Sequence, residues 1–331
     1  MKRIILAILL LAIVGSGAYF LSGKKSAQET DSEKEGKSDV RFIFSKAIEE
    51  VEILDRIAEE KGFYEKNGVT VEKIIAEKGF NTILMAGEGD VLISTYTGSL
   101  NAFLNNGETR ALADLFVPFN HQGVSRFSKG EESKITKVAI QDLAGDPSNV
   151  MKNALKNLGI DSGSVETVAV TSYSGRLAML EKGEVDFIIL HGADVMSEVA
   201  KKDNLTIYES GEITRGLKSM RAITSSEKAI NSNPQGIRSF VNAIYDTLEY
   251  MDNNPEELKS LLQEKYNYSA EQAENFYLGY ASARKDVAFV PSAGFARGLA
   301  ENLKAENKIN SDRNMEEYIY AGFAQEAVGR K

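Results

Sequence analysis

The sequence lacks cysteine and tryptophan entirely and contains only two histidines among its 331 residues. The absence of cysteine excludes disulfides, thiolate zinc sites, iron–sulfur clusters, a cysteine nucleophile and a lipid-anchored N-terminal cysteine. No Ser–His–Asp spacing, HExxH motif or phosphate-binding GxxxxGK motif is present either. We therefore expect a protein that is not an enzyme and that needs neither a cofactor nor a metal.

The sequence also lacks a basic block. Its 39 Lys and Arg residues stand against 48 Asp and Glu residues, which gives a formal net charge of -9. This balance argues against a nucleic-acid partner. With 43% apolar and 26% charged residues, the composition is that of an ordinary globular protein, long enough for one large or two medium domains.

The N-terminus has the pattern of an export signal. Met1, Lys2 and Arg3 precede an uncharged, largely apolar run at 4–21, and a short positive start followed by such a run is typical of exported proteins. The run is also near the minimum length that spans a bilayer. Residues 1–22 are therefore predicted to be either a cleaved signal peptide or an uncleaved membrane anchor, which places the protein in the periplasm or at the extracellular face of the cytoplasmic membrane.

Residues 23–39 mix both charges and contain no large apolar side chain. Such a segment buries too little surface to offset the entropy lost on ordering. We predict a disordered charged linker.

From residue 40 onward, short β-rich runs alternate with helical patterns, which is typical of an α/β fold with parallel sheets. After Ser226 the pattern is helical alone, and Asn233-Pro234 and Asn254-Pro255 are both helix-start signals. No internal repeat at a fixed period is visible, and the two α/β blocks do not align residue by residue. The predicted strands are 41–45, 69–75, 91–94, 137–140, 167–171, 185–190, 205–208 and 221–224.

Four segments, in this order, resemble the solute-binding proteins of nitrate, taurine, aliphatic-sulfonate and thiamine-precursor importers. They are 57–72 (IAEEKGFYEKNGVTVE), 84–90 (LMAGEGD), 177–186 (LAMLEKGEVD) and the stretch from Asn233-Pro234 to 254–257 (NPEE). The sequence departs from the family pattern at 135–140, which lacks the usual Gly-Lys, and at His191-Gly192, where a proline is usual.

The resemblance implies a two-lobed, periplasmic-binding-protein-like (type II) fold with a helical C-terminal segment. Lobe I would comprise 40–120 plus 220–331, lobe II would comprise 128–212, and the crossings would lie at 119–127 and 213–220. It also implies a monomer that captures a small-molecule ligand and delivers it to an ABC permease encoded as a separate chain. The alternative on the same fold is an enzyme similar to a thiamine-pyrimidine synthase, which uses a cysteine cluster that this sequence lacks.

Ligands of open α/β sheets bind beyond the carboxyl ends of the strands, where loops and helix N-termini converge. This rule selects the polar residues in the loops after the predicted strands. A glycine in such a loop also lets a ligand approach the backbone. The candidate ligand contacts are Ser45, Lys46, Thr95, Tyr96, Thr97, Gly98, Ser148, Asn149, Ser172, Tyr173, Arg176 and His191.

Each candidate has a structural alternative. Ser148 and Asn149 could simply cap a helix, and Tyr96 and Tyr173 could pack at the rim of their sheets. Arg176 could bind a carboxylate or sulfonate of the ligand, or pair with Glu181 on its own helix. The hydroxyl-rich loops suit a heterocycle such as a thiamine precursor, whereas Arg176 suits a sulfonate or nitrate. We lean towards the heterocycle because no cluster of basic residues follows the strands.

Overall fold

The computed structural model describes residues 38–44, 48–76, 79–116, 121–141, 143, 146–191, 198–215, 220–286, 288–307, 309 and 311–330. The predicted signal or anchor at 1–22 lies outside these residues. Of the predicted linker, Ser38 and Asp39 belong to the first strand, because they pair with Val69 and Thr70. Within the described part of the chain, no helix is both long enough and apolar enough to cross a membrane.

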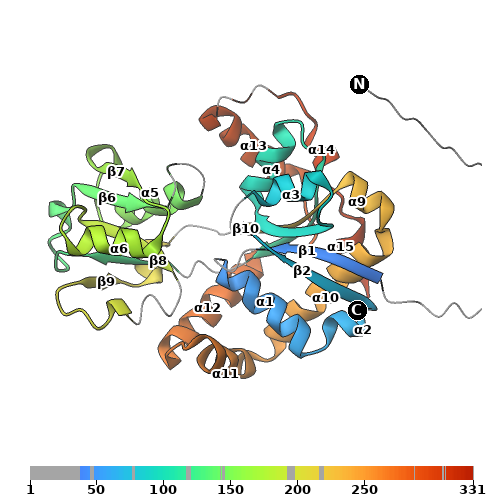
Figure 1. The fold of residues 1–331 in the computed structure, drawn as a ribbon, viewed down its shortest axis with the longest axis horizontal. Helices are drawn as coiled ribbons and strands as arrows, with labels where there is room; N and C mark the ends of the chain where they lie inside the picture. Colours follow the sequence, from blue (N-terminus) through green and yellow to red (C-terminus); the bar gives the residue numbers. More distant parts are fainter. Residues whose placement is uncertain are drawn as a thin grey trace, which may run out of the picture. The chain divides into compact units, whose positions relative to one another are not determined.

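The first sheet has five strands in the order β2-β1-β3-β10-β4. The chain leaves this sheet after β4 and returns to it about a hundred residues later in β10 (Figure 1). Its strands are β1 (Ser38–Phe44), β2 (Val69–Ile75), β3 (Val91–Thr95), β4 (Thr109–Phe116) and β10 (Met220–Ser226).

The second sheet also has five strands, in the order β7-β6-β8-β5-β9. Residues 119–127, predicted as a crossing between lobes, include β5, which pairs with both β8 and β9. The lobe boundaries themselves stay predictions. The strands of this sheet are β5 (His121–Ser125), β6 (Lys137–Ile140), β7 (Glu166–Ala169), β8 (Phe187–His191) and β9 (Thr206–Tyr208).

Each of the predicted parallel sheets contains one antiparallel strand. β10 is antiparallel to β3 and β4, and β5 is antiparallel to β8 and β9. In each case this is the strand by which the chain arrives from the other sheet. It therefore enters without the crossover helix that makes neighbouring strands parallel.

The two sheets repeat one another with an offset of 96 residues, which the sequence pattern did not reveal. β3 and β8 differ by this offset at both ends. The carboxylate of Asp90 accepts a hydrogen bond from the backbone N–H of Arg41 at 2.8 Å, and the carboxylate of Asp186 accepts one from that of Lys137 at 3.0 Å. The aspartates of the two family segments thus fasten β1 to the start of β3 in the first sheet and β6 to the start of β8 in the second.

The turn before each aspartate repeats as well. Gly87 and Gly183 end their helices with φ of 76° and 73°, a left-handed conformation that glycine adopts without strain. Glu88 and Glu184 then donate their backbone N–H groups to Ile83 and Met179. The shared G-E-x-D letters therefore encode one helix-to-strand turn, used twice.

Helices cover both faces of each sheet (Figure 1). In the first, α1, α10, α11, α12 and α15 contribute to one apolar core, while α3, α4, α13 and α14 pack on the opposite face. In the second, α5 and α8 pack on one face and α6 on the other. Two short 3-10 helices span Glu132–Lys134 and Ser162–Ser164. The helices are α1 (Glu49–Glu60), α2 (Phe63–Lys66), α3 (Phe80–Ala86), α4 (Tyr96–Leu104), α5 (Asp146–Asn157), α6 (Tyr173–Glu181), α8 (Ser210–Ile213), α9 (Glu227–Ser232), α10 (Pro234–Asn253), α11 (Pro255–Tyr266), α12 (Ala270–Asp286), α13 (Ala293–Asn307), α14 (Met315–Tyr318) and α15 (Gly322–Gly329).

Both predicted helix starts in the C-terminal segment are confirmed. The side chain of Asn233 accepts a hydrogen bond from the Gly236 N–H, with Pro234 in the first turn of α10. Its amide also donates to the carbonyl of Asp39 at 2.7 Å. Asn233 therefore both starts α10, the longest helix that the structure describes, and holds it against the start of β1.

Candidate ligand-binding site

The carboxyl end of β3 leads directly into α4. Thr95 is the N-cap residue, and its hydroxyl accepts a hydrogen bond from the N–H of Gly98 at 3.1 Å. The carbonyl of Gly98 accepts a bond from the Asn81 amide on α3. The predicted loop at 95–98 is thus the capped first turn of a helix, with Thr95, Thr97 and Gly98 half-buried.

Tyr96 lies in the core rather than on a rim. It is 1% exposed, and its ring meets Phe295 and Tyr318 edge-on, with ring centroids 5.1 and 5.7 Å apart. Its hydroxyl has no hydrogen-bond partner. The ring of Tyr96 is therefore covered by side chains of α13 and α14. Only its hydroxyl oxygen could contact a polar group, and this oxygen is buried inside the core.

A buried carboxyl lies beneath α4. Asp114 on β4 is 6% exposed, and burial raises its pKa from 3.8 to about 7. Its Oδ1 atom has no hydrogen-bond partner, and four nearby side chains, on β3, α4 and α14, each have a hydroxyl in the same state. We call this set the Asp114 cluster: Ser94, Tyr96, Ser99, Asp114 and Tyr318.

A buried ion pair lies at the same edge of the first sheet. Arg221 on β10 is directly opposite Thr95 in the register and donates to Glu50 on α1 at 2.6 Å. On the same first turn of α1, Glu49 accepts a bond from the hydroxyl of Tyr268 at 2.8 Å. The acidic first turn of α1 is therefore engaged in packing rather than being a solvated face.

In the second sheet, α6 begins beyond the carboxyl end of β7. The hydroxyl of Ser172 caps the helix by accepting a bond from the Gly175 N–H at 3.1 Å. Tyr173, half-buried, carries the Arg176 guanidinium over its ring, 4.6 Å from the centroid. The predicted loop at 172–176 is again a capped helix start.

Arg176 carries a buried positive charge with no carboxylate partner among the described residues. It is 1% exposed, and its Nη1 atom donates to the carbonyls of Val170 and Thr171, the two residues that follow β7. Its Nε atom has no partner, and burial lowers its pKa from 12.5 to about 10. The alternative pairing with Glu181 is wrong, because Glu181 pairs with Lys202.

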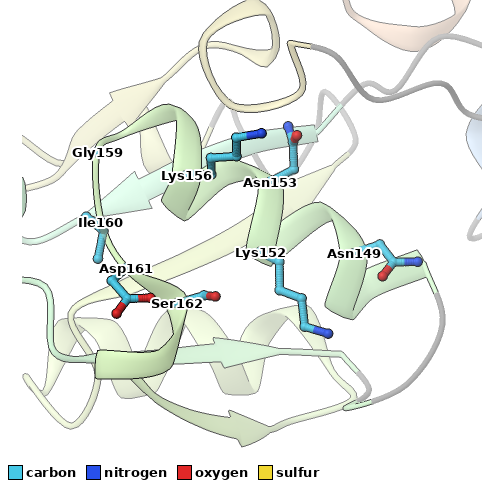
Figure 2. A pocket seen from close by; sticks show the side chains of 8 residues that line it. All are labelled: Asn149, Lys152, Asn153, Lys156, Gly159, Ile160, Asp161 and Ser162. Atoms are coloured by element: carbon cyan, nitrogen blue, oxygen red, sulfur yellow. The ribbon is translucent and has the colours of Figure 1, made fainter. Parts of the chain in front are cut away.

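The helix after β6 starts before Ser148 and Asn149, the two residues that were considered as its cap. α5 begins at Asp146, so Ser148 and Asn149 lie within its first turn and do not cap it. Asn149 lines a shallow groove of about 720 Å³ along the exposed side of α5 (Figure 2). The groove is formed by Asn149, Lys152, Asn153, Lys156, Gly159, Ile160, Asp161 and Ser162.

Three candidates cannot be placed. Ser45 and Lys46 lie outside the described residues, as does the side chain of His191, whose backbone ends β8 opposite His121. Over the described part of the chain, no three His, Asp or Glu side chains are grouped so that they could hold a metal ion.

A family model, NMT1/THI5 like, matches residues 55–258, which is well over half of the chain. The chain belongs to the NMT1/THI5-like family. This confirms the resemblance inferred from the four sequence segments, all of which lie inside the match. No curated protein sequence matches the chain.

Solved structures share the fold of this NMT1/THI5-like chain. The periplasmic aliphatic sulphonate binding protein SsuA from Escherichia coli is 14% identical, with a TM-score of 0.62 over 85% of this chain and 97% of its own. The alkanesulfonate-binding protein SsuA from Xanthomonas axonopodis pv. citri, bound to MOPS, is 13% identical, with a TM-score of 0.62 over 86% and 99%. The periplasmic nitrate-binding protein NrtA from Synechocystis PCC 6803 is 16% identical, with a TM-score of 0.62 over 88% of both chains.

Sequence reasoning missed two groups in this NMT1/THI5-like chain, Asp114 and the Glu50–Arg221 pair. β4 was not predicted as a strand, so Asp114 had no assigned position. Arg221 is the second residue of the antiparallel strand β10, and the amino end of such a strand lies at the carboxyl ends of the strands beside it. That rule would have brought Arg221 beside Thr95 once the direction of β10 was known.

Proposed function

We propose that this protein is an exported solute-binding protein that captures a small solute between its two lobes and delivers it to an ABC permease on a separate chain. The observation that carries the proposal is the pair of sheets with the same strand order, each with a capped helix start and polar groups at the carboxyl ends of its strands. A ligand that touches both lobes would favour their closed arrangement, because only that state makes both sets of contacts.

The ligand of this proposal is a small anion, and Arg176 is its principal contact. Burying an ionised group without a counter-charge is unfavourable, and Arg176 is buried with backbone carbonyls as its only hydrogen-bond partners among the described residues. A sulfonate or nitrate would supply both the charge and the acceptor oxygens, and a guanidinium binds such planar or tripodal oxygens well. The sulfonate- and nitrate-binding proteins that share the fold support the same class.

The heterocycle that the sequence analysis favoured is now the weaker alternative. It relied on the hydroxyl-rich loops at 95–98 and 172–174, which are the capped first turns of α4 and α6, and the hydroxyl-bearing Tyr96 is packed inside the core. The enzyme alternative depends on a cysteine cluster, and the sequence has no cysteine.

Isothermal titration with alkanesulfonates, nitrate and a thiamine pyrimidine tests the ligand class. Arg176→Lys should weaken binding of the preferred anion about ten- to a hundred-fold, because the ammonium cannot reproduce the planar donor set, a loss of about 1.4–3 kcal/mol. The matched control is Arg126→Lys, which changes an arginine directly after β5 that is already paired with Asp186 and should leave binding unchanged. Unaltered anion affinity in Arg176→Lys would refute the assigned contact, and binding of no tested solute would refute the function.

Export is part of the same proposal, supported by the apolar run at 4–21 behind Lys2 and Arg3. Whether the segment is removed decides between a free periplasmic protein and one tethered at the membrane. Mass spectrometry of the mature protein, purified from the envelope fraction, distinguishes the two: cleavage near Ser16-Gly17-Ala18 gives a shortened chain, and an anchor gives the full mass in the membrane fraction.

A further inference from the structure

The chain passes between the two sheets twice. It leaves the first sheet at Phe116, the end of β4, and enters the second at His121, the start of β5. It returns between Arg215 and Met220, where β10 begins. We call residues 213–215, which are the last residue of α8 and the two that follow it, the return segment, because they directly precede this second passage.

Two asparagines of α5 hold the return segment. The amide of Asn153 donates to the carbonyls of Ile213 and Arg215 at 2.8 and 3.2 Å. The amide of Asn157, one helical turn later, donates to the same two carbonyls at 3.2 and 3.0 Å. Two amide groups supply four N–H donors, and two carbonyls supply four lone pairs. The four bonds therefore use every donor and acceptor, at a helix end whose carbonyls have no partners within the helix.

The first passage is attached to the same short helix. Gln122, the second residue of β5, is 6% exposed and donates to the carboxylate of Glu209 at 2.7 Å. Glu209 is the N-cap residue of α8, where it forms a capping box with Glu212. At the other end of α8, Ile213 is buried in the apolar core that α5 shares with β8. Both passages are therefore joined to α8, and α8 is joined to α5.

The far end of the return is held from the first sheet. Arg221, the second residue of β10, forms its buried ion pair with Glu50 in the first turn of α1. α1 follows β1 as α5 follows β6, so the two helices are equivalent in the repeat. Both begin beyond the carboxyl ends of these strands, where ligands of such sheets bind. The second passage is thus attached, at each end, to a helix that begins at the candidate site.

We propose that Asn153 and Asn157 are positioning residues for solute capture, which fix the return segment to α5 so that the two lobes move about a defined axis. The proposal rests on the proposed function, in which closure of the lobes holds the solute. A return segment released from α5 would regain backbone freedom, and the lobes would sample more orientations. The fraction of molecules that can contact the solute from both sides would fall, and the apparent affinity falls in proportion to that fraction.

Distances between the lobes of the ligand-free protein test this proposal. Because the chain has no cysteine, spin labels can be placed uniquely at the exposed sites Gln263→Cys on α11 and Lys182→Cys after α6. The variant Asn153→Asp/Asn157→Asp keeps the side-chain shape and removes the donors. Its distance distribution, from pulsed electron paramagnetic resonance, should be broader than the native one by about half or more. A pair within the second lobe, Lys182→Cys and Glu166→Cys, should keep its distribution.

Two further variants separate hydrogen bonding from charge. Lys152→Gln/Lys156→Gln changes the charge of the same helix by the same amount and should leave the inter-lobe distribution as in the native protein. Asn153→Ala/Asn157→Ala removes the donors without adding charge and should broaden it. In calorimetric titrations with ethanesulfonate and nitrate, the alanine variant should bind the preferred anion about ten-fold more weakly than the native protein.

The outcomes separate this inference from the proposed function. If the two asparagine variants keep the native inter-lobe distribution, the bonds only pack α8 and the inference is overturned, whatever the protein binds. Equal broadening in the lysine variant, or within the second lobe, would overturn it as well, because charge or loss of the lobe's own structure would then be the cause. If the distances change as expected and no tested solute binds, the positioning role stands and the proposed function is refuted.

Discussion

The pH dependence of stability offers a test of Asp114 that requires no ligand. Its pKa is raised from 3.8 to about 7 by burial, so the folded protein holds this proton more tightly than the unfolded chain does. Stability therefore falls as the pH rises from about 4 to about 7 and is level above that range. At about 1.4 kcal/mol per pH unit, the whole effect is about 4 kcal/mol.

Asp114→Asn should abolish this loss, because the amide has nearly the same shape and does not ionise. Relative to the native protein, the variant should gain about 3 kcal/mol between pH 5 and pH 8, most of it below pH 7. Urea unfolding followed by far-ultraviolet circular dichroism measures the difference, since the chain has no tryptophan to report fluorescence. The control is Glu301→Gln, an exposed carboxylate on α13, which should shift stability equally at both pH values.

A flat difference between Asp114→Asn and the native protein from pH 5 to pH 8 would refute the reasoning. It would mean that Asp114 is solvated or paired with a cation in the folded protein.

Two other predictions use the same unfolding assay. Tyr318→Phe should leave stability unchanged or raise it slightly, because the lost hydroxyl had no hydrogen-bond partner. Tyr280→Phe should lower stability by about 1–2 kcal/mol, because the hydroxyl of Tyr280 donates to Asp252. Equal losses of stability in the two variants would contradict the assignment of partners. Asp186→Ala should destabilise the protein by about 3 kcal/mol or more at pH 7, because two backbone N–H groups, the Thr136 hydroxyl and Arg126 lose their acceptor. Although burial opposes its ionisation, these bonds lower the pKa of Asp186, so the difference should shrink only in acid, as the pH falls through that lowered pKa; a difference that grew in acid would be the contrary result.

The strands that sequence reasoning found are those with a clear apolar run. β2 and β6 agree with the prediction at both ends. β4 was missed because Ala111, Ala113 and the leucines around them are strong helix formers, and only pairing with β10 makes them a strand. β5 was missed because its HQGVS sequence has a single β-branched residue. Its Gly123 is needed because a Cβ there would lie 2.5 Å from the Phe187 ring.

Only part of the candidate site, likewise, could be predicted from the sequence. The rule that ligands bind beyond strand ends selected Thr95 and Ser172, which the structure places as N-cap residues of α4 and α6. It could not say which side chains turn inward, because that depends on packing from distant segments. Tyr96 is buried by α13 and α14, which follow it by about two hundred residues. Asp114 stands out only because those same helices cover it.

Residues that are alike at equivalent positions of the 96-residue repeat are those that the fold requires, whereas residues that differ are free to contact a ligand. Positions that build the turn are alike in both sheets, with Gly87 and Asp90 matching Gly183 and Asp186. At the strand ends the offset instead matches Thr95 with His191, and at the helix starts it matches Phe80 with Arg176. Phe80, the equivalent of Arg176 in the first sheet, carries no charge. The shared fold therefore does not require the buried charge of Arg176. Arg176 is therefore one position at which the two sheets differ in chemistry while agreeing in structure, and that difference supports the proposal that an anionic solute contacts the second sheet.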